Sequence, residues 1–244
     1  IYLPKFYRDF KDRSARNTTD DVRKQLVALN KASVDGIVLD LRDNAGGALI
    51  DARDTAGLFI EKGPIVQVKG SSPFYNVLKD KDKSVTYSGP LVILINTYSA
   101  SASEILAAAL QDYGRAVIVG SNSFGKGTVQ TFVDLDQSYP TYANRYDSLG
   151  SLKVTIQKFY RITGESTQNK GVVPDILLPD SYTFLDVGER HLEHPLPWDT
   201  IDPVYYTPWL SHSIDMNRLS KLSKKRTKTS FENLVTHIDY VKKQ

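Results

Sequence analysis

Apolar residues recur with a helical period in two stretches near the start of the chain. In the first, TTDDVRKQLVAL, Val22, Leu26 and Leu29 fall on one face, after Thr and Asp residues that suit a helix N-terminus. In the second, ALIDARDTAGLFIEKG, the helix is expected to end at Gly63. Between them, the short apolar run VDGIVLDLR has the composition of a buried strand. The chain is therefore predicted to begin as helix, strand and helix.

Later apolar stretches are mostly strand-like. PIVQVKG and SVTYSG predict short strands on either side of a polar loop, GPLVILIN and RAVIVG predict buried strands, and the alternation in TVQTFVDL and SLKVTIQKFY predicts half-buried strands. GPLVILIN leads through TYSA into an Ala- and Leu-rich helix, SASEILAAALQDYG. Because strands and helices interleave, the predicted fold class is α/β.

The chain changes character near Asp180. Pro and aromatic residues dominate the segment HPLPWDTIDPVYYTPW, and the residues that follow it are helical in pattern and basic. We therefore predict a core over residues 1–180, and at 181–244 a Pro- and aromatic-rich linker with a basic helical C-terminal segment.

The composition is that of an ordinary globular protein. Of the 244 residues, 41% are hydrophobic and 24% are charged, which suits one main core. No apolar run approaches the roughly 18 residues that a membrane-spanning helix needs. The first residue is Ile1 and not Met, so we expect an excised or processed fragment whose targeting signal lies outside it.

The formal net charge of +3 is unevenly distributed. Residues 214–244 contain eight Lys and Arg against three Asp and Glu, so the rest of the chain is mildly acidic. A basic tail of this kind can contact nucleic acid or anionic lipid, but it lacks interleaved aromatic residues and any nucleic-acid-binding motif. We therefore interpret it as the solvated face of a helix and predict no nucleic-acid partner.

The distribution of His and Cys restricts the chemistry. The chain has no Cys, and all four His residues lie at position 191 or later. Residues 1–190 therefore cannot form a His-based zinc site or a Ser-His or Cys-His pair by themselves. We predict neither a metal nor a cofactor.

One loop, GSNSFGKGTVQ, differs by a single residue from a nucleotide-binding loop. Gly127 stands where the Ser or Thr that holds magnesium should be, and TVQTFVDL continues as a strand, whereas a phosphate loop leads into a helix. Nucleotide binding is therefore not predicted. The flanking glycines can instead pack Lys126 so closely that it loses its proton and acts as a base, or the loop can be a turn whose lysine faces water. In an extended segment Gln130 faces the same way as Lys126 and can orient it, or it is a surface glutamine.

A base requires a group to activate, and YSASASEI offers serine hydroxyls between a buried strand and a helix. Ser101 stands three residues before Glu104, which is the spacing of a capping box. The same position also suits a nucleophile, because main-chain amides at a helix N-terminus can stabilise an oxyanion. The amide of Ala102 is one candidate donor, and the amide of Gly47, in the turn DLRDNAGG, is another.

The three motifs DLRDNAGG, SASASEI and FGKGTVQ, in this order and with 25 positions from Ser101 to Lys126, resemble the C-terminal processing peptidases, also called tail-specific proteases. GPLVILIN, QDYGRAVIVG and IQKFYRITGESTQNKGVVPDI agree with this family, and LPWDTID resembles its periplasmic branch in Gram-negative bacteria. The resemblance covers residues 34–202.

The resemblance implies a serine endopeptidase with the ββα superhelix shared by the ClpP and crotonase groups, here with a C-terminal helical extension. It makes Ser101 the nucleophile, Lys126 the general base and Gln130 the residue that orients the lysine, and it places the oxyanion between the amides of Gly47 and Ala102. It also implies periplasmic location and protein substrates recognised through accessible C-termini.

Some features depart from the family or concern other functions. Nothing in the chain matches the family's PDZ domain, and Ala45 stands where many relatives have Pro or Gly. Asp112, eleven residues after Ser101, would lie three helical turns away, about 16 Å, and is interpreted as structural. Two other functions remain open, a non-catalytic peptide-binding or scaffold module with the same fold, and an acyl-CoA enzyme of the crotonase type.

Overall fold

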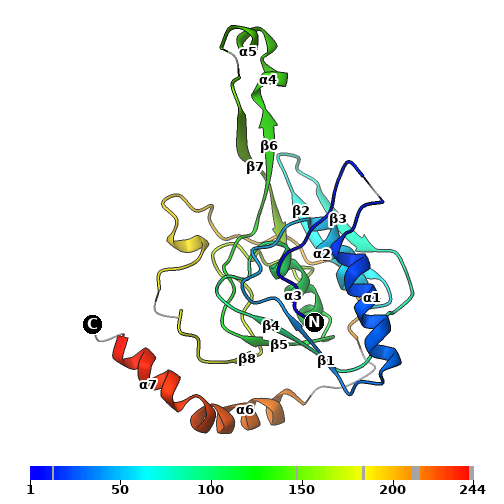
Figure 1. The fold of residues 1–244 in the computed structure, drawn as a ribbon, viewed down its shortest axis with the longest axis vertical. Helices are drawn as coiled ribbons and strands as arrows, with labels where there is room; N and C mark the ends of the chain where they lie inside the picture. Colours follow the sequence, from blue (N-terminus) through cyan, green and yellow to red (C-terminus); the bar gives the residue numbers. More distant parts are fainter. Residues whose placement is uncertain (13, 147, 183–184, 210–214, 242–244) are drawn as a thin grey trace.

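Two four-stranded sheets organise the computed structural model, which describes residues 1–12, 14–146, 148–182, 185–209 and 215–241 (Figure 1). The first sheet is parallel, in the order β1-β4-β5-β8, and consists of β1 (Ile37–Asp40), β4 (Leu91–Ile95), β5 (Val117–Gly120) and β8 (Ile176–Leu177). The second is antiparallel, in the order β3-β2-β7-β6, and consists of β2 (Gly63–Lys69), β3 (Tyr75–Asp80), β6 (Thr128–Asp134) and β7 (Ser151–Tyr160).

The helices have distinct positions around these sheets. They are α1 (Thr18–Lys31), α2 (Leu49–Gly57), α3 (Ala102–Asp112), the short α4 (Leu135–Ser138) and α5 (Pro140–Tyr146), a single 3₁₀ turn η1 (Glu189–His191), α6 (Met216–Ser230) and α7 (Glu232–Val241). Helix α3 packs against β5 of the parallel sheet and β2 of the antiparallel sheet, and α2 packs beside it. The α/β class and the helical C-terminal extension are therefore confirmed.

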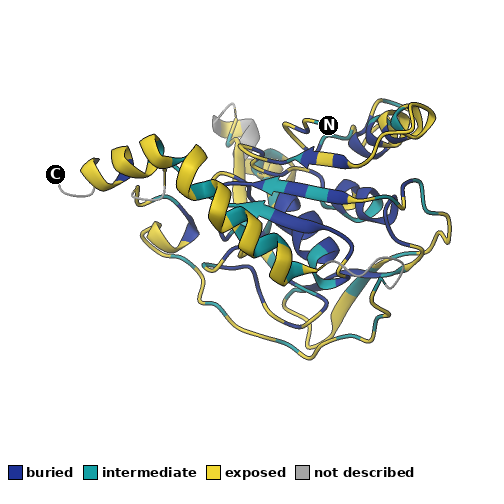
Figure 2. Cartoon of the chain, turned by 90° about the horizontal axis from the view of Figure 1, so that it is seen from below, coloured by how far each residue is buried: buried dark blue, intermediate teal, exposed yellow. Residues whose placement is uncertain are grey.

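Helix α3 lies in the centre of the core because its sequence has no polar face. Its residues from Ala102 to Leu110 are all buried. Small Ala side chains allow the two sheets to approach the helix closely, and the dark blue centre of Figure 2 shows the resulting core. The beginning of this buried helix is consequently fixed to both sheets.

The parallel sheet brings three loops to one edge. Asp40 is paired with Leu94, and Ile95 with Gly120, so β1, β4 and β5 end side by side. Because the carboxyl ends of parallel strands meet at the same edge, the loops after these strands face one another. Those loops contain DNAGG, TYSAS and NSFGKG.

Strands β6 and β7 form a long hairpin that projects from the body of the molecule and carries α4 and α5 at its tip (Figure 1). Phe132 on the projecting part is 71% exposed, whereas Phe159 and Tyr160 at the end of β7 are buried. Residues of intermediate burial alternate with exposed ones along β6, as expected, whereas β7 is mostly exposed until it reaches the buried Phe159 and Tyr160.

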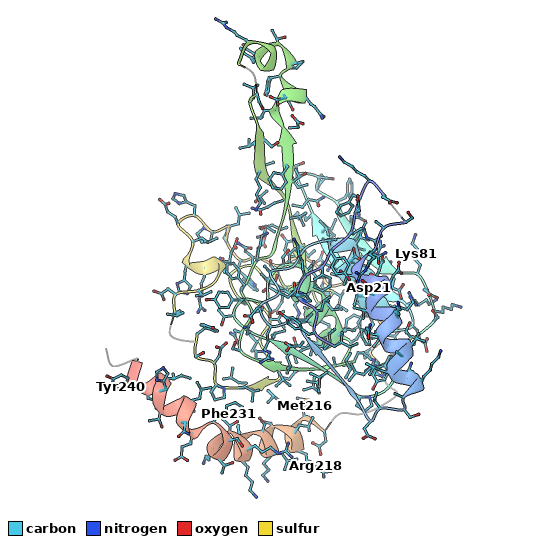
Figure 3. All side chains as sticks on the ribbon, viewed as in Figure 1. Asp21, Lys81, Met216, Arg218, Phe231 and Tyr240 are labelled. Carbon is cyan, nitrogen blue, oxygen red and sulfur yellow. The ribbon has the colours of Figure 1, made fainter. Side chains whose placement is uncertain are left out.

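The C-terminal part of the chain returns over the core before it forms its last helices. Ile201 and Val204 donate their main-chain N–H groups to Gly164 and Ile162, at 2.9 Å each. Helices α6 and α7 then run along one edge of the molecule, where the labels of Met216, Phe231 and Tyr240 mark their course (Figure 3). All described residues of α6 are at least partly exposed, as expected for a solvated basic helix.

Two predicted boundaries are wrong. Helix α2 ends at Gly57 and not at Gly63, and the buried residues Leu58, Phe59 and Ile60 follow it as a turn. The carbonyl of Leu58 instead accepts hydrogen bonds from the N–H groups of Thr86 and Tyr87.

The second error concerns the strand paired with β2. SVTYSG is not a strand, and the partner is β3, which lies within the segment expected to be a polar loop. Val77 pairs with Gln67 in this ladder. Pairing with a buried neighbour strand therefore outweighs the polar composition of the segment.

Candidate active site

A cleft of about 440 Å³ opens where the three loops meet. It is lined by residues from each loop, namely Asp43, Ala45, Tyr98, Ala100, Phe124 and Lys126. The structure therefore brings the segments of all three sequence motifs to one place.

Ser101 occupies a sharp turn between β4 and α3. It is the N-cap residue of α3 and has φ 57° and ψ −111°, a conformation that residues other than glycine rarely adopt. The neighbouring amide of Ala100 donates to the carbonyl of Asn44 at 2.9 Å, which ties this turn to the loop after β1. A strained strand-to-helix turn of this kind is typical of a nucleophilic serine.

Glu104 links the serine turn to the lysine loop. The capping box with Ser101 is present, and the Ser101 N–H donates to Glu104 Oε2 at 2.7 Å. The same oxygen accepts the N–H of Lys126 at 2.9 Å, and Oε1 accepts the N–H of Gly125 at 2.7 Å and the hydroxyl of Ser123 at 2.6 Å. One buried carboxylate thus joins the peptide units of both candidate catalytic residues, so the cap and the catalytic interpretation of Ser101 are compatible.

Burial dominates the electrostatics of Glu104. It raises the pKa of this carboxyl to about 7, and the four hydrogen-bond donors oppose the rise because they favour the charged form. Sequence reasoning recognised Glu104 only as a capping residue. Its contacts with the lysine loop, 19 to 22 residues away, were not visible in the pattern.

The two predicted oxyanion donors lie on facing loops. A Cβ atom at Gly46 would come within 2.9 Å of the Ala102 nitrogen and 2.8 Å of the Ser101 Cβ, so the Gly46-Gly47 turn lies directly against the start of α3. Phe6 fixes this turn, since its N–H donates to the Gly46 carbonyl and its own carbonyl accepts the N–H of Ala48, each at 3.0 Å. Gly47, with φ 140°, has no room for a side chain, because a Cβ would lie 1.8 Å from the Phe6 oxygen.

Lys126 is half-buried between two tightly packed glycines. A Cβ at Gly127 would come within 2.6 Å of the Gln168 nitrogen, and Gly125, with φ 90°, lies against Asn169. Burial lowers the pKa of Lys126 below its usual range, and the positive charge of Lys153 lowers it further. Within the described part of the chain, Lys126 has no salt bridge and its Nζ has no hydrogen bond to the Ser101 hydroxyl.

Gln130 lies on β6, beside an irregularity in the β6–β7 ladder between Val129 and Gln130. Its side chain is exposed, whereas Thr128, two residues earlier, is buried. Among the described residues, no hydrogen bond connects Gln130 to Lys126. The role of Gln130 therefore stays a prediction.

Two asparagines that the sequence did not single out hold the loops together. Asn96 and Asp43 exchange two hydrogen bonds, of 2.8 and 2.9 Å. Asn44 accepts the Gly46 N–H at 2.9 Å through its side chain, and its carbonyl accepts the hydroxyl of Ser103 at 2.8 Å. The sequence offered one signal for each of these residues, because Asn96 follows a buried strand and Asn44 lies in a Gly-rich turn.

Asp112 lies away from this cluster, at the C-terminal end of α3. Its side chain is 4% exposed and forms an ion pair with Arg161, the residue after β7. The contact supports the structural interpretation of Asp112. Among the described residues, no group of three His, Asp or Glu side chains is arranged to hold a metal ion.

Sequence models of two families match the chain. Peptidase family S41 matches residues 1–178, and a family described as the C-terminal domain of tail specific protease (DUF3340) matches residues 182–244. The tail-specific protease of Haemophilus influenzae is 45% identical over 212 residues, which cover 84% of this chain and 28% of that protein. The carboxy-terminal processing protease CtpA of Bacillus subtilis is 37% identical, with coverage of 75% and 37%. The chain thus spans well under half of either relative.

Solved structures show the same relationship. The photosystem II D1 C-terminal processing protease superimposes with a TM-score of 0.60 at 31% identity, covering 72% of this chain and 41% of that protein. Mature CPAF has a TM-score of 0.55 at 16% identity, with coverage of 72% and 46%, which is a likeness of fold. With the family match extending over the sheets, α3 and all three loops of the cleft, the chain belongs to peptidase family S41.

Proposed function

We propose that this chain carries the catalytic core of a serine endopeptidase with a Ser-Lys dyad. Neutral Lys126 takes the proton of the Ser101 hydroxyl, and Ser101 Oγ attacks the peptide carbonyl. The main-chain N–H groups of Gly47 and Ala102 stabilise the oxyanion, and Gln130 orients the lysine. Lys126 then gives its proton to the leaving amine and later activates the water that hydrolyses the acyl-enzyme.

The observation that carries this proposal is the shared Glu104 carboxylate. It accepts the main-chain N–H groups of both Ser101 and Lys126, so the nucleophile and the base are held relative to each other through their backbones. Burial of Lys126, which lowers its pKa, supports its role as a base. Family S41 membership agrees with this chemistry.

The relatives support a proposal on the substrates and the location of the complete protein. Their names describe tail-specific and carboxy-terminal processing proteases. We propose that the complete protein acts on proteins with accessible C-termini, recruited by a PDZ domain outside this chain, and that it works in the periplasm of a Gram-negative bacterium. No helix in the described segments has the length and apolar content required to cross a bilayer. We further propose that 1–180 is the catalytic core and 181–244 the linker and helical extension.

A second candidate function is a non-catalytic peptide-binding module. The observation that favours it is the lack of a Ser101 to Lys126 hydrogen bond within the described residues. Apo active sites often acquire such contacts only with substrate, so this geometry is compatible with catalysis as well.

Proteolysis of a denatured protein by the wild-type chain, Ser101→Ala and Lys126→Ala separates these functions. We expect each substitution to reduce cleavage by at least about 10³-fold, because removal of one member of a catalytic dyad disables the unit.

The kcat/KM should rise with pH through the pKa of Lys126, below the usual lysine value of about 10.4, because only the neutral amine is a base. Trapping by a fluorophosphonate, read by mass spectrometry, should label Ser101, and a labelled wild type excludes the crotonase-type alternative. Unchanged cleavage by Lys126→Ala would show that the dyad is assigned wrongly.

A further inference from the structure

The lysine loop is held on two sides. Glu104 from α3 binds one side, through the N–H groups of Gly125 and Lys126. The other side contacts residues 166–169 and the 3₁₀ turn η1, which belongs to the C-terminal segment and lies beyond the S41 match over 1–178. The contacts of this second side have no part in the proposed mechanism.

Gln168 makes the first contact of this second side. It is completely buried, and its Oε1 accepts the N–H of Gly127 at 2.8 Å. Because an N–H can only donate, the amide oxygen must face Gly127, and the Nε2 group must face away from it. Nε2 donates to Glu189 Oε1 and to the Leu196 carbonyl, at 3.2 Å each. Two acceptors from the C-terminal segment therefore set the orientation of the side chain that holds Gly127.

Glu189 also contacts the lysine loop directly. It is 9% exposed, and its own N–H donates to the carbonyl of Phe124 at 2.9 Å. Gly188, with φ 132°, allows this approach, since a Cβ there would lie 3.1 Å from the Phe124 oxygen. Glu189 is thus bonded to the lysine loop on both sides of Lys126. It bonds directly to the Phe124 carbonyl, and through Gln168 to the Gly127 N–H.

The charges around Lys126 give this residue an electrostatic role as well. The positive charge of Lys153 on β7 opposes protonation of Lys126, whereas the negative charges of Glu104 on α3 and Glu189 on η1 favour it. Asp43 lines the same cleft as Lys126. Four donors already occupy the Glu104 carboxylate, but the side-chain contact described for Glu189 is the single bond from neutral Gln168. The charge of Glu189 is therefore less compensated by hydrogen bonds.

We propose that Glu189 is a positioning residue for the base: through Gln168 and the Phe124 carbonyl it holds the loop of Lys126, and its carboxylate sets the charge balance at the amine. The proposal rests on the proposed function, in which Lys126 is the general base. It makes the C-terminal segment a part of the catalytic apparatus, because the S41 region alone lacks this carboxylate.

Glu189→Gln in the 244-residue chain tests the electrostatic part. The substitution keeps an oxygen that can accept from Gln168 and removes only the charge. We expect the pKa of Lys126 to fall, because the loss of a nearby opposite charge disfavours the protonated amine. The pKa is measured from the pH dependence of Lys126 acetylation, followed by peptide mass spectrometry. The acidic limb of kcat/KM against pH should move in the same direction by the same amount.

Glu193→Gln is the matched control, since Glu193 lies two residues beyond η1 and its side chain is 89% exposed. It should leave both the acetylation pKa and the pH profile unchanged. Glu189→Asp retains the charge and should keep the wild-type acetylation pKa, whereas a merely structural glutamate would make the Asp and Gln variants equally perturbed. If Glu189→Gln does not fold, Gln168→Ala remains as the test of the contact between Glu189 and the lysine loop.

Gln168→Ala tests the positional part. It leaves the Gly127 N–H without its acceptor, so kcat should fall about tenfold with little change in KM. Identical acetylation pKa values for wild type and Glu189→Gln would overturn the proposal. The acetylation measurement needs no turnover, so a wild type without proteolysis would refute the proposed function and leave this test intact.

Discussion

At the scale of single residues, the most consequential contact is the one made by Glu104. A carboxylate can accept on both oxygens, and here each oxygen accepts from two groups. Among the residues that the structure describes, no positively charged side chain is in hydrogen-bond contact with Glu104, so its burial is balanced by donors from the serine turn and the lysine loop. The architecture of the site therefore depends on the chemistry of one side chain.

Glu104→Gln is expected to reduce the free energy of unfolding by about 2 kcal/mol at pH 5, because in either orientation the amide nitrogen would face at least one N–H donor, that of Gly125 or those of Ser101 and Lys126. This penalty should become smaller toward pH 8. The pKa of Glu104 is raised to about 7 in the folded state, so its stabilising contribution is present below about pH 4.5 and lost as the pH rises through 7. Urea unfolding of both proteins at the two pH values measures this. A penalty that increases with pH would contradict it, and Glu193→Gln, on an exposed side chain, is the control.

At the scale of elements, the start of α3 and the turn after β1 behave as one unit. The N–H of Ala100 and the hydroxyl of Ser103 both donate to the Asn44 carbonyl, and Gly46 lies against Ser101 and Ala102. These contacts hold the two segments against each other at the ends of β1 and β4.

Gly46→Ala should disrupt this contact. Its added Cβ would lie 2.7 Å from the Ala100 oxygen and 2.8 Å from the Ser101 Cβ, at a φ of 98°, so we expect a loss of stability of about 2–3 kcal/mol and a loss of peptidase activity in the remaining folded protein.

Gly114→Ala provides the comparison for this variant. Gly114 also has a positive φ, of 64°, but nothing lies within 4 Å of its Cβ position. It should cost only about 1 kcal/mol of backbone strain and leave kcat/KM unchanged. Calorimetry and peptide hydrolysis distinguish the two, and equal activity of both variants would show that the contact between the loops is unimportant.

At the scale of the whole molecule, the segment after η1 binds the two sheets and the helical core from outside. Trp198 donates its indole N–H to the Ser166 carbonyl at 2.9 Å, and the Lys170 amine lies 3.3 Å from the centre of its ring. Trp209 donates its N–H to the Tyr113 carbonyl at 2.8 Å, and its ring lies 5.0 Å from the buried Arg115 guanidinium. Residues 198–209 therefore cover buried groups of the core.

Truncation at two points separates the contributions of this segment and of the last helices. A chain of residues 1–215 lacks α6 and α7, which are largely exposed, and should keep most of its thermal stability (Figure 2). A chain of residues 1–197 also loses both tryptophans and the Ile201 and Val204 hydrogen bonds, and it should melt at least about 10 °C lower. Scanning calorimetry measures both. Similar melting temperatures for the two truncations would contradict the assignment of residues 198–209 to the folded core.

Much of the fold was predictable, because it depends on local periodicity. Strands β1, β4, β5, β6 and β7 and helices α1 and α3 lie where the apolar spacing places them. The errors at α2 and β3 share one cause. Whether Leu58 ends a helix, and whether residues 75–80 form a strand, depends on partners such as Thr86 and β2 that are distant in sequence.

The sequence by itself determined which residues can carry the chemistry. The lack of Cys and the late positions of all His residues exclude a Ser-His or Cys-His pair within residues 1–190, and the resemblance to the C-terminal processing peptidases makes Ser101 and Lys126 the proposed dyad. The tertiary structure decided how those residues are held, through Glu104, Asn44 and Glu189. These contacts join segments of different loops across a folded sheet edge. Local periodicity reports which face of an element is apolar, but it carries no information on which distant donor reaches a buried carboxylate.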